Sequence, residues 1–549
     1  MKKTLALILA ILMLSSCLFS CDEDFFFDDE SGDFTSDTGV EQTDKQTESE
    51  KPTEIPTQDS SQTDGTKITV AIPAGPDFDG ETLTILHRDS KSAQREWYKE
   101  TAEDSLDEVI GWKNDCITEI LDLKIQYKAC GSYYYEDCLN EFTKAIKADV
   151  DNDLHLYDIV ANYAYAGASV HVRDYIANLA DKEIFPYFDF KDPSWNQSIV
   201  NECLINDQLY YITGDINLST FDKSMVVFFN KSLYDKKKEP SDPADLQELA
   251  IAGDGAKGGF TYDVLYRWAT VFEETNGDTG IQHDDFHAIS APYTSVSIDA
   301  LPHAWDLNFI TTNRRFGTHS YDIVGNSKIE AAITKAQNLL NGEISKGVCN
   351  DDNTEECSLG GYTESITHLV YDKSIFAFHI LYNNQTDNEM MREEMISAFG
   401  LLPMPKYDEN QLNYGTTAHD SYTLMTVIDH SLSSIPTKGE EISAYLQLST
   451  EESRINVRGY YIHAIVKPKY FGLNTDIEKS VTIANILMDN IELPFISVYA
   501  PQLNGVLSSC WRDVVTRNGY SITAKDAYET DQANFDAALD EVDRWLKLK

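Results

Sequence analysis

The sequence predicts an α/β protein with two sheets, each rich in parallel strands and flanked by helices. Strand-like and helix-like segments alternate between residues 81 and 164, which is the order typical of a parallel sheet with right-handed crossovers. A second series of such segments starts at Met225. About 480 residues follow the N-terminal region, and a stretch of this length exceeds one hydrophobic core, so we expect two domains or more.

The first unit combines apolar runs that favour strands with apolar residues at helical spacing. In chain order we expect a strand at 81–88, a helix at 104–121, a strand at 123–129, a helix at 134–148, a strand at 157–164 and a helix near 168–178. Ligands of such sheets bind beyond the carboxyl ends of the strands. Those ends carry Arg88, Tyr163 and Tyr165.

The second unit follows a turn at Gly214 and Asp215, and we interpret residues 209–215 as a hinge strand that leads into it. We expect strands at 225–229 and 374–382, helices at 262–273, 327–343, 387–398, 438–450 and 476–490, and a strand, a loop and a strand over 399–427. Later segments return to complete both units. We therefore predict one lobe at about 79–212 and a second at about 216–405, with parts of the C-terminal region added.

The N-terminus has the pattern of a lipoprotein signal. Residues 1–21 combine two early lysines with an apolar run that is shorter than the roughly 20 residues a membrane span needs. Both Cys17 and Cys21 follow small residues as in a bacterial lipobox, and we favour Cys21; an ordinary cleaved signal is the alternative. Residues 22–78 are an acidic, aliphatic-poor tether in which no core can form. We therefore expect a chain held by lipid on the outer face of the cell membrane.

Composition narrows the partners and the chemistry. The formal net charge of −47 leaves no basic stripe for nucleic acid, and it disfavours broad contact with anionic lipid. Seven cysteines follow the signal region; one alternative is a bridge of Cys130 with Cys138 or of Cys349 with Cys357, and the other is that the cysteines are buried reduced thiols. The signatures of nucleophilic, zinc-dependent and nucleotide-binding enzymes are missing.

One loop has a spacing near that of a calcium site. Glu274, Asn276, Asp278 and Asp285 hold positions one, three, five and twelve, but Thr279 stands where the sharp turn needs glycine. A solvated loop is the favoured interpretation, so we expect no metal and no cofactor.

The order of several short motifs resembles the extracellular solute-binding lipoproteins of carbohydrate ABC transporters, family 1-like and of the Firmicutes type. The matching pieces are "YDIVANYA", "DFKDPSWNQSIV", "LYYITGDINLS", "VVFFNKSLYD", "TNGDTGIQHDDFHAI" and "LPMPKYDENQLNY". The resemblance implies a two-lobed fold of the periplasmic-binding-protein type II class with a ligand cleft between the lobes. It also implies a monomer that delivers a mono- or oligosaccharide to permease subunits. A secreted carbohydrate-active enzyme and a binding protein that feeds a sensor kinase are the alternatives.

A sugar site needs aromatic faces for the C–H surfaces of the ring and polar side chains for its hydroxyls. Position at the end of a strand favours four residues, and position in a loop adds three. For the two tryptophans among the loop residues, packing between the domains is the alternative explanation. The candidate residues are Arg88, Tyr163, Tyr165, Asp215, Trp305, Asp420 and Trp511.

Overall fold

The structure is a computed structural model that describes most of the chain from residue 77 onward. The described ranges are 77–89, 91–97, 102, 105–131, 134–273, 285–291, 298–340, 348–349, 361–382, 390–391, 393–462, 477–516 and 522–548. The predicted signal with Cys17 and Cys21, the tether up to residue 76 and most of the calcium-like loop lie outside them. Within these ranges, no helix combines the length and the hydropathy that a membrane crossing requires.

The first sheet has the strand order β13-β3-β1-β2. Its strands are β1 (Glu81–Arg88), β2 (Leu123–Cys130), β3 (Ile159–Tyr163) and β13 (Thr423–Val427). β1 runs parallel to β2 and to β3, and β13 returns antiparallel along β3 with Thr423 opposite Tyr163. β13, which comes from much later in the chain than β3, thus brings residues 419–423 to the carboxyl end of β3.

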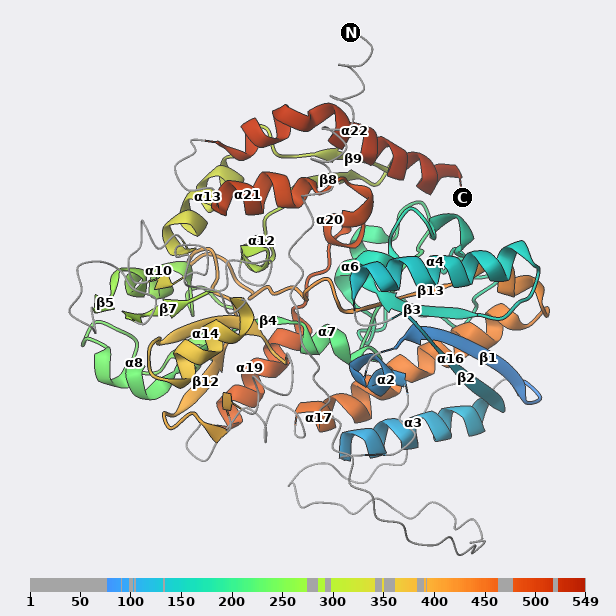
Figure 1. Ribbon diagram of the computed structural model, residues 1–549, viewed down its shortest axis with the longest axis horizontal. Helices are drawn as coiled ribbons and strands as arrows, with labels where there is room; N and C mark the ends of the chain where they lie inside the picture. The colour runs from blue at the N-terminus through green and yellow to red at the C-terminus, as the bar shows by residue number, and fades with distance from the viewer. Residues whose placement is uncertain are drawn as a thin grey trace, which may run out of the picture. The chain divides into compact units, whose positions relative to one another are not determined.

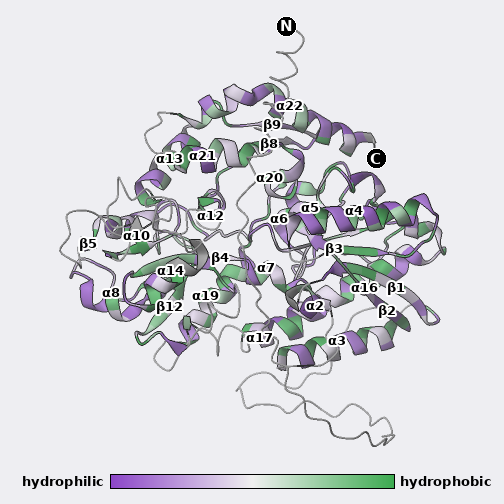
Figure 2. Cartoon of the chain, in the orientation of Figure 1, coloured by the Kyte–Doolittle hydropathy of each residue, from purple (hydrophilic) through white to green (hydrophobic). Residues whose placement is uncertain are grey.

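Helices cover this sheet as the apolar spacing predicted. The helices are α3 (Ser105–Leu121), α4 (Tyr135–Asp151) and α16 (Lys438–Glu452). α4 lies over one face of the strands, where Phe142 and Ile146 join Leu86 and Val160 in one buried cluster. Figure 1 shows α3 and α16 on the opposite side from α4. The outer helix faces carry polar residues (Figure 2). β1 and β3 are buried along most of their length, whereas the edge strand β2 exposes Lys124, Gln126 and Lys128.

The second sheet has the order β10-β7-β11-β4-β12. Its strands are β4 (Met225–Asn230), β7 (Ile289–Ser290), β10 (Val348–Cys349), β11 (Phe376–Ile380) and β12 (Phe399–Leu402). β4 runs antiparallel to both of its neighbours, whereas β7 is parallel to β10 and β11. Every residue of β4 and β11 is buried, so these strands read as continuous apolar runs. The predicted α/β class with two sheets is confirmed.

Two family-like motifs have structural roles in this second part of the fold. The Asn230 side chain at the end of β4 accepts a hydrogen bond from the Leu233 amide and so caps α8 (Lys231–Lys237). The Lys406 ammonium, buried beside the proline turn, donates to the carbonyls of Ala256 (2.9 Å) and Leu412 (2.6 Å). A buried charge needs such partners, and here they fix the loop around the turn.

Three segments of the chain lie side by side between the two sheets: one at Ser224, one at residues 416–418 and one at Ile491. Ser224 forms an antiparallel bridge with Ala418, and Thr416 forms a parallel bridge with Ile491. The predicted hinge segment 209–215 contains no regular strand. Within it, Ile212 forms an isolated bridge with Met425 of β13. Short backbone pairings of this kind hold segments together and leave few bonds to disturb when their ends rotate.

A group of elements from the later chain forms a further layer at the top of Figure 1. It includes the hairpin β8 (Ile310–Asn313) and β9 (Thr318–Tyr321), α13 (Ser327–Leu340), α20 (Phe495–Val498), α21 (Asp513–Thr516) and α22 (Ala524–Leu548), while α12 (Ala300–Ala304) lies nearer the middle of the view. The Asp543 carboxylate of α22 accepts hydrogen bonds from the His319 amide (2.8 Å) and ring Nδ1 (2.6 Å). This pair joins α22 to β9.

Two predicted helices were wrong. Residues 168–178 contain no α-helix: α5 (Ala164–Gly167) ends before them, and only one short 3-10 turn, Arg173–Tyr175, lies within them, because β-branched Val170 and Val172 disfavour continuation of a helix. The helix predicted at 262–273 ends at Tyr266, and a 3-10 turn and a short strand follow it. The helix predicted near 387–398 lies mainly outside the described residues.

Candidate functional site

Three tyrosines meet at the carboxyl end of β3. Tyr135, at the start of α4, makes edge-on contacts with Tyr163 and Tyr165, with ring centroids 6.1 and 5.1 Å apart. All three rings are half-buried. The Tyr163 hydroxyl donates a hydrogen bond of 2.9 Å to the Asp420 carboxylate. The structure thus brings together three of the predicted residues, Tyr163, Tyr165 and Asp420.

Arg88 packs against the Tyr163 ring of this cluster. Its guanidinium carbon lies 5.5 Å from the centre of the Tyr163 ring, and Nη2 donates to the Thr423 hydroxyl at 3.3 Å. Thr423 in turn donates to the buried Glu96 carboxylate at 2.5 Å. Burial raises the pKa of Glu96, and hydrogen bonds from Ser219 and Thr423 together with the Arg88 charge oppose that rise. Only 2% of the Arg88 surface is exposed, so its side chain positions Tyr163 rather than facing solvent.

A cavity of about 110 Å³ opens beside Tyr165 and Asp420. Its walls come from the end of β3, from the connecting segment before β13, from α12 and from the C-terminal segment. Its polar lining residues are Tyr165, Asp299, His303, Thr417, His419, Asp420, Tyr422, Ser497, Ser508 and Arg512. Its apolar floor includes Met225, Leu493 and Ile496. Segments distant in sequence therefore converge here.

Charge in the cavity is balanced and fixed by ion pairs. Arg512 binds Asp299 through two contacts, of which Nε to Oδ1 measures 3.1 Å. Burial lowers the pKa of His303 to about 4, and the Asp299 charge offsets part of that fall. Burial also lowers the pKa of His419, with Asp420 opposing the shift. Both imidazoles are therefore neutral at pH 7, where each offers one donor and one acceptor nitrogen.

Asp215 lies away from this cavity. Its carboxylate contacts Arg454 at 3.0 Å and Arg458 at 3.9 Å, and the same two guanidinium groups bind Asp489. The adjacent Gly214 is required by close packing, because a Cβ there would lie 2.5 Å from the Ser194 carbonyl oxygen. The Gly-Asp turn therefore has a structural role in this arrangement.

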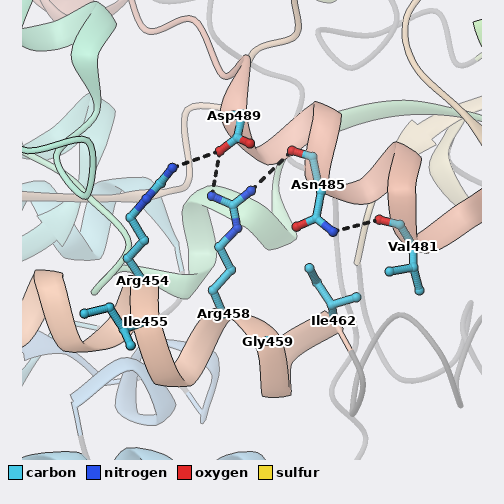
Figure 3. A pocket seen from close by; sticks show the side chains of 8 residues that line it. All are labelled: Arg454, Ile455, Arg458, Gly459, Ile462, Val481, Asn485 and Asp489. Atoms are coloured by element: carbon cyan, nitrogen blue, oxygen red, sulfur yellow. Dashed lines mark hydrogen bonds and ion pairs between the residues drawn. The ribbon is translucent and has the colours of Figure 1, made fainter. Parts of the chain in front are cut away.

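Arg454, Arg458 and Asp489 also line a second, more open pocket of about 400 Å³ (Figure 3). Figure 3 shows Arg458 directed toward Asp489 and the Asn485 carbonyl, and the Asn485 side chain directed toward Val481. The arginine charges are already paired, and the side chains present no aromatic face. This pocket consequently lacks the features of a sugar site.

The two predicted tryptophans are enclosed by protein. Trp305 donates its indole N–H to the Pro405 carbonyl at 3.1 Å, and Trp511 donates to Ile298 at 2.7 Å. The two rings pack edge to face, with centroids 6.2 Å apart. Neither has exposed surface. Neither offers a ring face to a ligand in this structure.

Sequence reasoning missed the neighbours of these tryptophans. His303 precedes Trp305 by two positions and Arg512 follows Trp511 directly, and both of these polar residues line the cavity. His419 beside Asp420 and Tyr135 beside the tyrosine pair were also missed. The signal was present in the stretches "PHAWDL" and "SCWRDV", where each tryptophan has a polar neighbour within two positions.

No protein-family model matches the chain, and no curated protein matches it. Solved structures are similar over most of its length. Maltose-bound MalE3 of T. maritima is 11% identical, with a TM-score of 0.42 over 84% of this chain and 100% of that one. An ABC substrate-binding protein of Listeria monocytogenes in complex with cycloalternan is 12% identical, with a TM-score of 0.46 over 84% and 99%. A cyclo/maltodextrin-binding protein complexed with maltotetraose is 10% identical, with a TM-score of 0.46 over 84% and 96%.

Proposed function

We propose that this chain is an extracellular binding protein that captures a mono- or oligosaccharide in the cavity beside Tyr165 and delivers it to an ABC importer. The observation that carries the proposal is the composition of that cavity. Two tyrosine rings, two carboxylates, a guanidinium and two neutral imidazoles line it. Aromatic faces suit the apolar side of a pyranose, and charged hydrogen-bond partners suit its hydroxyls.

The surroundings of the cavity suit capture and release. Its walls come from the segments next to β3 and β13, from Met225 of β4 and from the connections between the two sheets, so rotation at the paired residues Ser224–Ala418 and Thr416–Ile491 would open it. Its volume of about 110 Å³ is below the roughly 300 Å³ or more that ligand pockets occupy. The proposal therefore includes a hinge motion that opens the site to admit the solute and then closes the two sheets around it.

A lipid anchor on Cys21 completes the proposal, because a binding protein that feeds a permease must stay near the membrane. In cells that export the full chain, Cys21→Ser should release the protein into the medium, as measured by fractionation. Retention of that variant together with release of Cys17→Ser would move the anchor to Cys17.

The test of sugar binding is a thermal-shift screen of mono- and oligosaccharides. A ligand at 100 times its dissociation constant stabilises the native state by about 2.7 kcal/mol, which is a clear rise in melting temperature. Tyr165→Ala should abolish the rise, and Tyr371→Ala, an exposed tyrosine at the end of α14 (Gly361–Val370), should keep it. If the ligand raised the melting temperature of both variants by the same amount, it would bind elsewhere.

A binder and an enzyme are separated by the fate of the sugar. Cavity carboxylates Asp299 and Asp420 are each held by a partner, Arg512 and Tyr163 respectively, which suits recognition of hydroxyls. A sugar that stabilises the protein should be recovered intact after prolonged incubation. Cleavage of it above a protein-free blank would favour the carbohydrate-active enzyme instead.

A further inference from the structure

A separate side-chain cluster lies on the first sheet's periphery, away from the cavity. Asp153 and His155 follow α4, and His430 follows β13. Oδ1 of Asp153 lies 3.4 Å from Nε2 of His155 and 3.4 Å from Nε2 of His430. The three ligand-type atoms all lie within 4.8 Å of one another. Among the residues that the structure describes, this is the group whose donor atoms converge in this way.

These separations fit a transition-metal ion. Two ligands bound about 2.0–2.1 Å from a tetrahedral Zn²⁺ lie about 3.4 Å apart. The donor set of two imidazoles and one carboxylate is one that Zn²⁺ accepts, with water free to take the remaining position. The Asp153 side chain is 84% exposed, so an ion and its water can enter from solvent.

The tautomer of one imidazole is already the one that a metal needs. Nδ1 of His155 lies 3.1 Å from the His430 carbonyl oxygen, so the ring donates its proton there and turns the Nε2 lone pair toward Asp153. Metal-ligating histidines commonly use their second nitrogen in this way. The His430 Nε2 atom is buried and makes no hydrogen bond, which leaves its lone pair or proton facing the same carboxylate.

The backbone holds the ligands in place at a cost. Asp153 and His155 both adopt left-handed backbone conformations, with φ of 55° and 53°, which are uncommon for residues other than glycine. The two imidazoles stack with centroids 4.0 Å apart and planes 9° apart. To share one ion the rings must open from this stacking, and rotation about the soft terminal torsion of histidine permits that.

We propose that Asp153, His155 and His430 bind one divalent transition-metal ion of the Zn²⁺ type and thereby fasten the turn after α4 to the turn after β13. These turns flank β3 and β13, which are neighbours in the sheet. The ion would stabilise one end of the strands β3 and β13. Tyr163 lies at the other end. The proposal is independent of sugar binding.

The test is a titration of the tag-free protein with Zn²⁺ alone, in excess Mg²⁺ to occupy weak carboxylate sites. We expect one Zn²⁺ per chain and a rise in melting temperature on binding. His155→Gln, His430→Gln and Asp153→Asn should each weaken binding at least about 10-fold, the lower bound for loss even of a supporting partner. Co²⁺ should replace Zn²⁺ and give the visible absorption of a tetrahedral site.

The matched control is His171→Gln, a single exposed histidine on the same part of the chain. It should bind Zn²⁺ as the wild type does. Absence of stoichiometric binding by the wild type would overturn the proposal. Wild-type affinity for Zn²⁺ in all three cluster variants would overturn it as well. So would a loss of affinity in the control as large as that in the cluster variants. Circular dichroism of each apo variant verifies that it is folded before titration.

Discussion

The hydroxyl of Tyr163 donates a hydrogen bond of 2.9 Å to the carboxylate of Asp420, a residue 257 positions away in the chain. It joins the carboxyl end of β3 to the segment that returns from the second sheet. The same Asp420 lines the cavity, and Tyr163 rests over Arg88. The carboxylate that we expect to meet a sugar hydroxyl is therefore oriented by the half-buried Tyr163, which the buried Arg88 supports.

Tyr163→Phe removes this hydrogen bond and keeps the ring. A hydrogen bond to a charged group contributes about 1.5 kcal/mol, so sugar affinity should fall about 10-fold with little change in stability. Isothermal titration with a sugar identified by the screen measures the effect. The control Tyr210→Phe removes a buried hydroxyl that has no hydrogen-bond partner among the described residues, and it should bind normally. Unchanged affinity in Tyr163→Phe would show that Asp420 needs no such support.

Trp511→Ala should destabilise the fold. The ring is fully buried, and its N–H is satisfied by the Ile298 carbonyl, so truncation should cost about 3–5 kcal/mol. Urea unfolding measures this cost, and Trp112→Ala, where the side chain on α3 is only half-buried, should cost less. A variant of normal stability that binds sugar weakly would restore the stacking role to Trp511.

The stability of the protein should depend on pH through Asp215. Burial raises the pKa of this carboxyl from 3.8 to about 6, although Arg458 and Arg454 oppose the rise. Between those values the folded state holds the proton more tightly than the unfolded chain does. This group's contribution to stability is therefore fully present below pH 3.8, and it is lost as the pH rises through about 6.

Asp215→Asn cannot titrate, so the variant isolates this contribution. The difference in unfolding free energy, wild type minus variant, should fall on the order of 2–3 kcal/mol as the pH rises from about 4 to about 6. Urea unfolding at closely spaced pH values measures it. A difference that stays constant, or that grows with pH, would mean that the two arginines hold the pKa at or below its ordinary value.

Ligand should close the two sheets on one another. Three connecting segments meet at Ser224, Ala418, Thr416 and Ile491, and rotation there changes the distance between the sheets without breaking either one. Small-angle scattering with saturating sugar should give a smaller radius of gyration than the free protein. A radius that does not change under saturation would contradict closure.

Much of the fold was predictable because its signals are local. The apolar spacing of Leu106, Val109, Ile110 and Ile117 predicted α3, and all four residues are buried. The uninterrupted apolar run from Met225 predicted a strand, and the structure places β4 there with every residue buried. The failure after Tyr266 is at a helix end, where tertiary contacts decide how far a weak periodicity extends, whereas the helix predicted near 168–178 is absent.

The site was less predictable because its geometry is set by contacts across long sequence separations. Asp215 finds its partners Arg454 and Arg458 more than 200 positions later, and no local pattern announces that pairing. In the stretch with Trp511 and Arg512, the larger apolar area of the indole drives it into the core. The charged neighbour is then left to face the cavity. Strand-end position, which placed Tyr163 and Tyr165, and loop position, which placed Asp420, did carry over to three dimensions.

The most direct test of the account is a crystal structure of the protein with a sugar that raises its melting temperature. The account predicts a sugar ring against the face of Tyr165, with hydroxyls bound to Asp420 and to the Asp299–Arg512 pair. It also predicts that Trp305 and Trp511 remain buried. A sugar bound at the pocket of Arg454 and Arg458, or against an exposed Trp511, would contradict it.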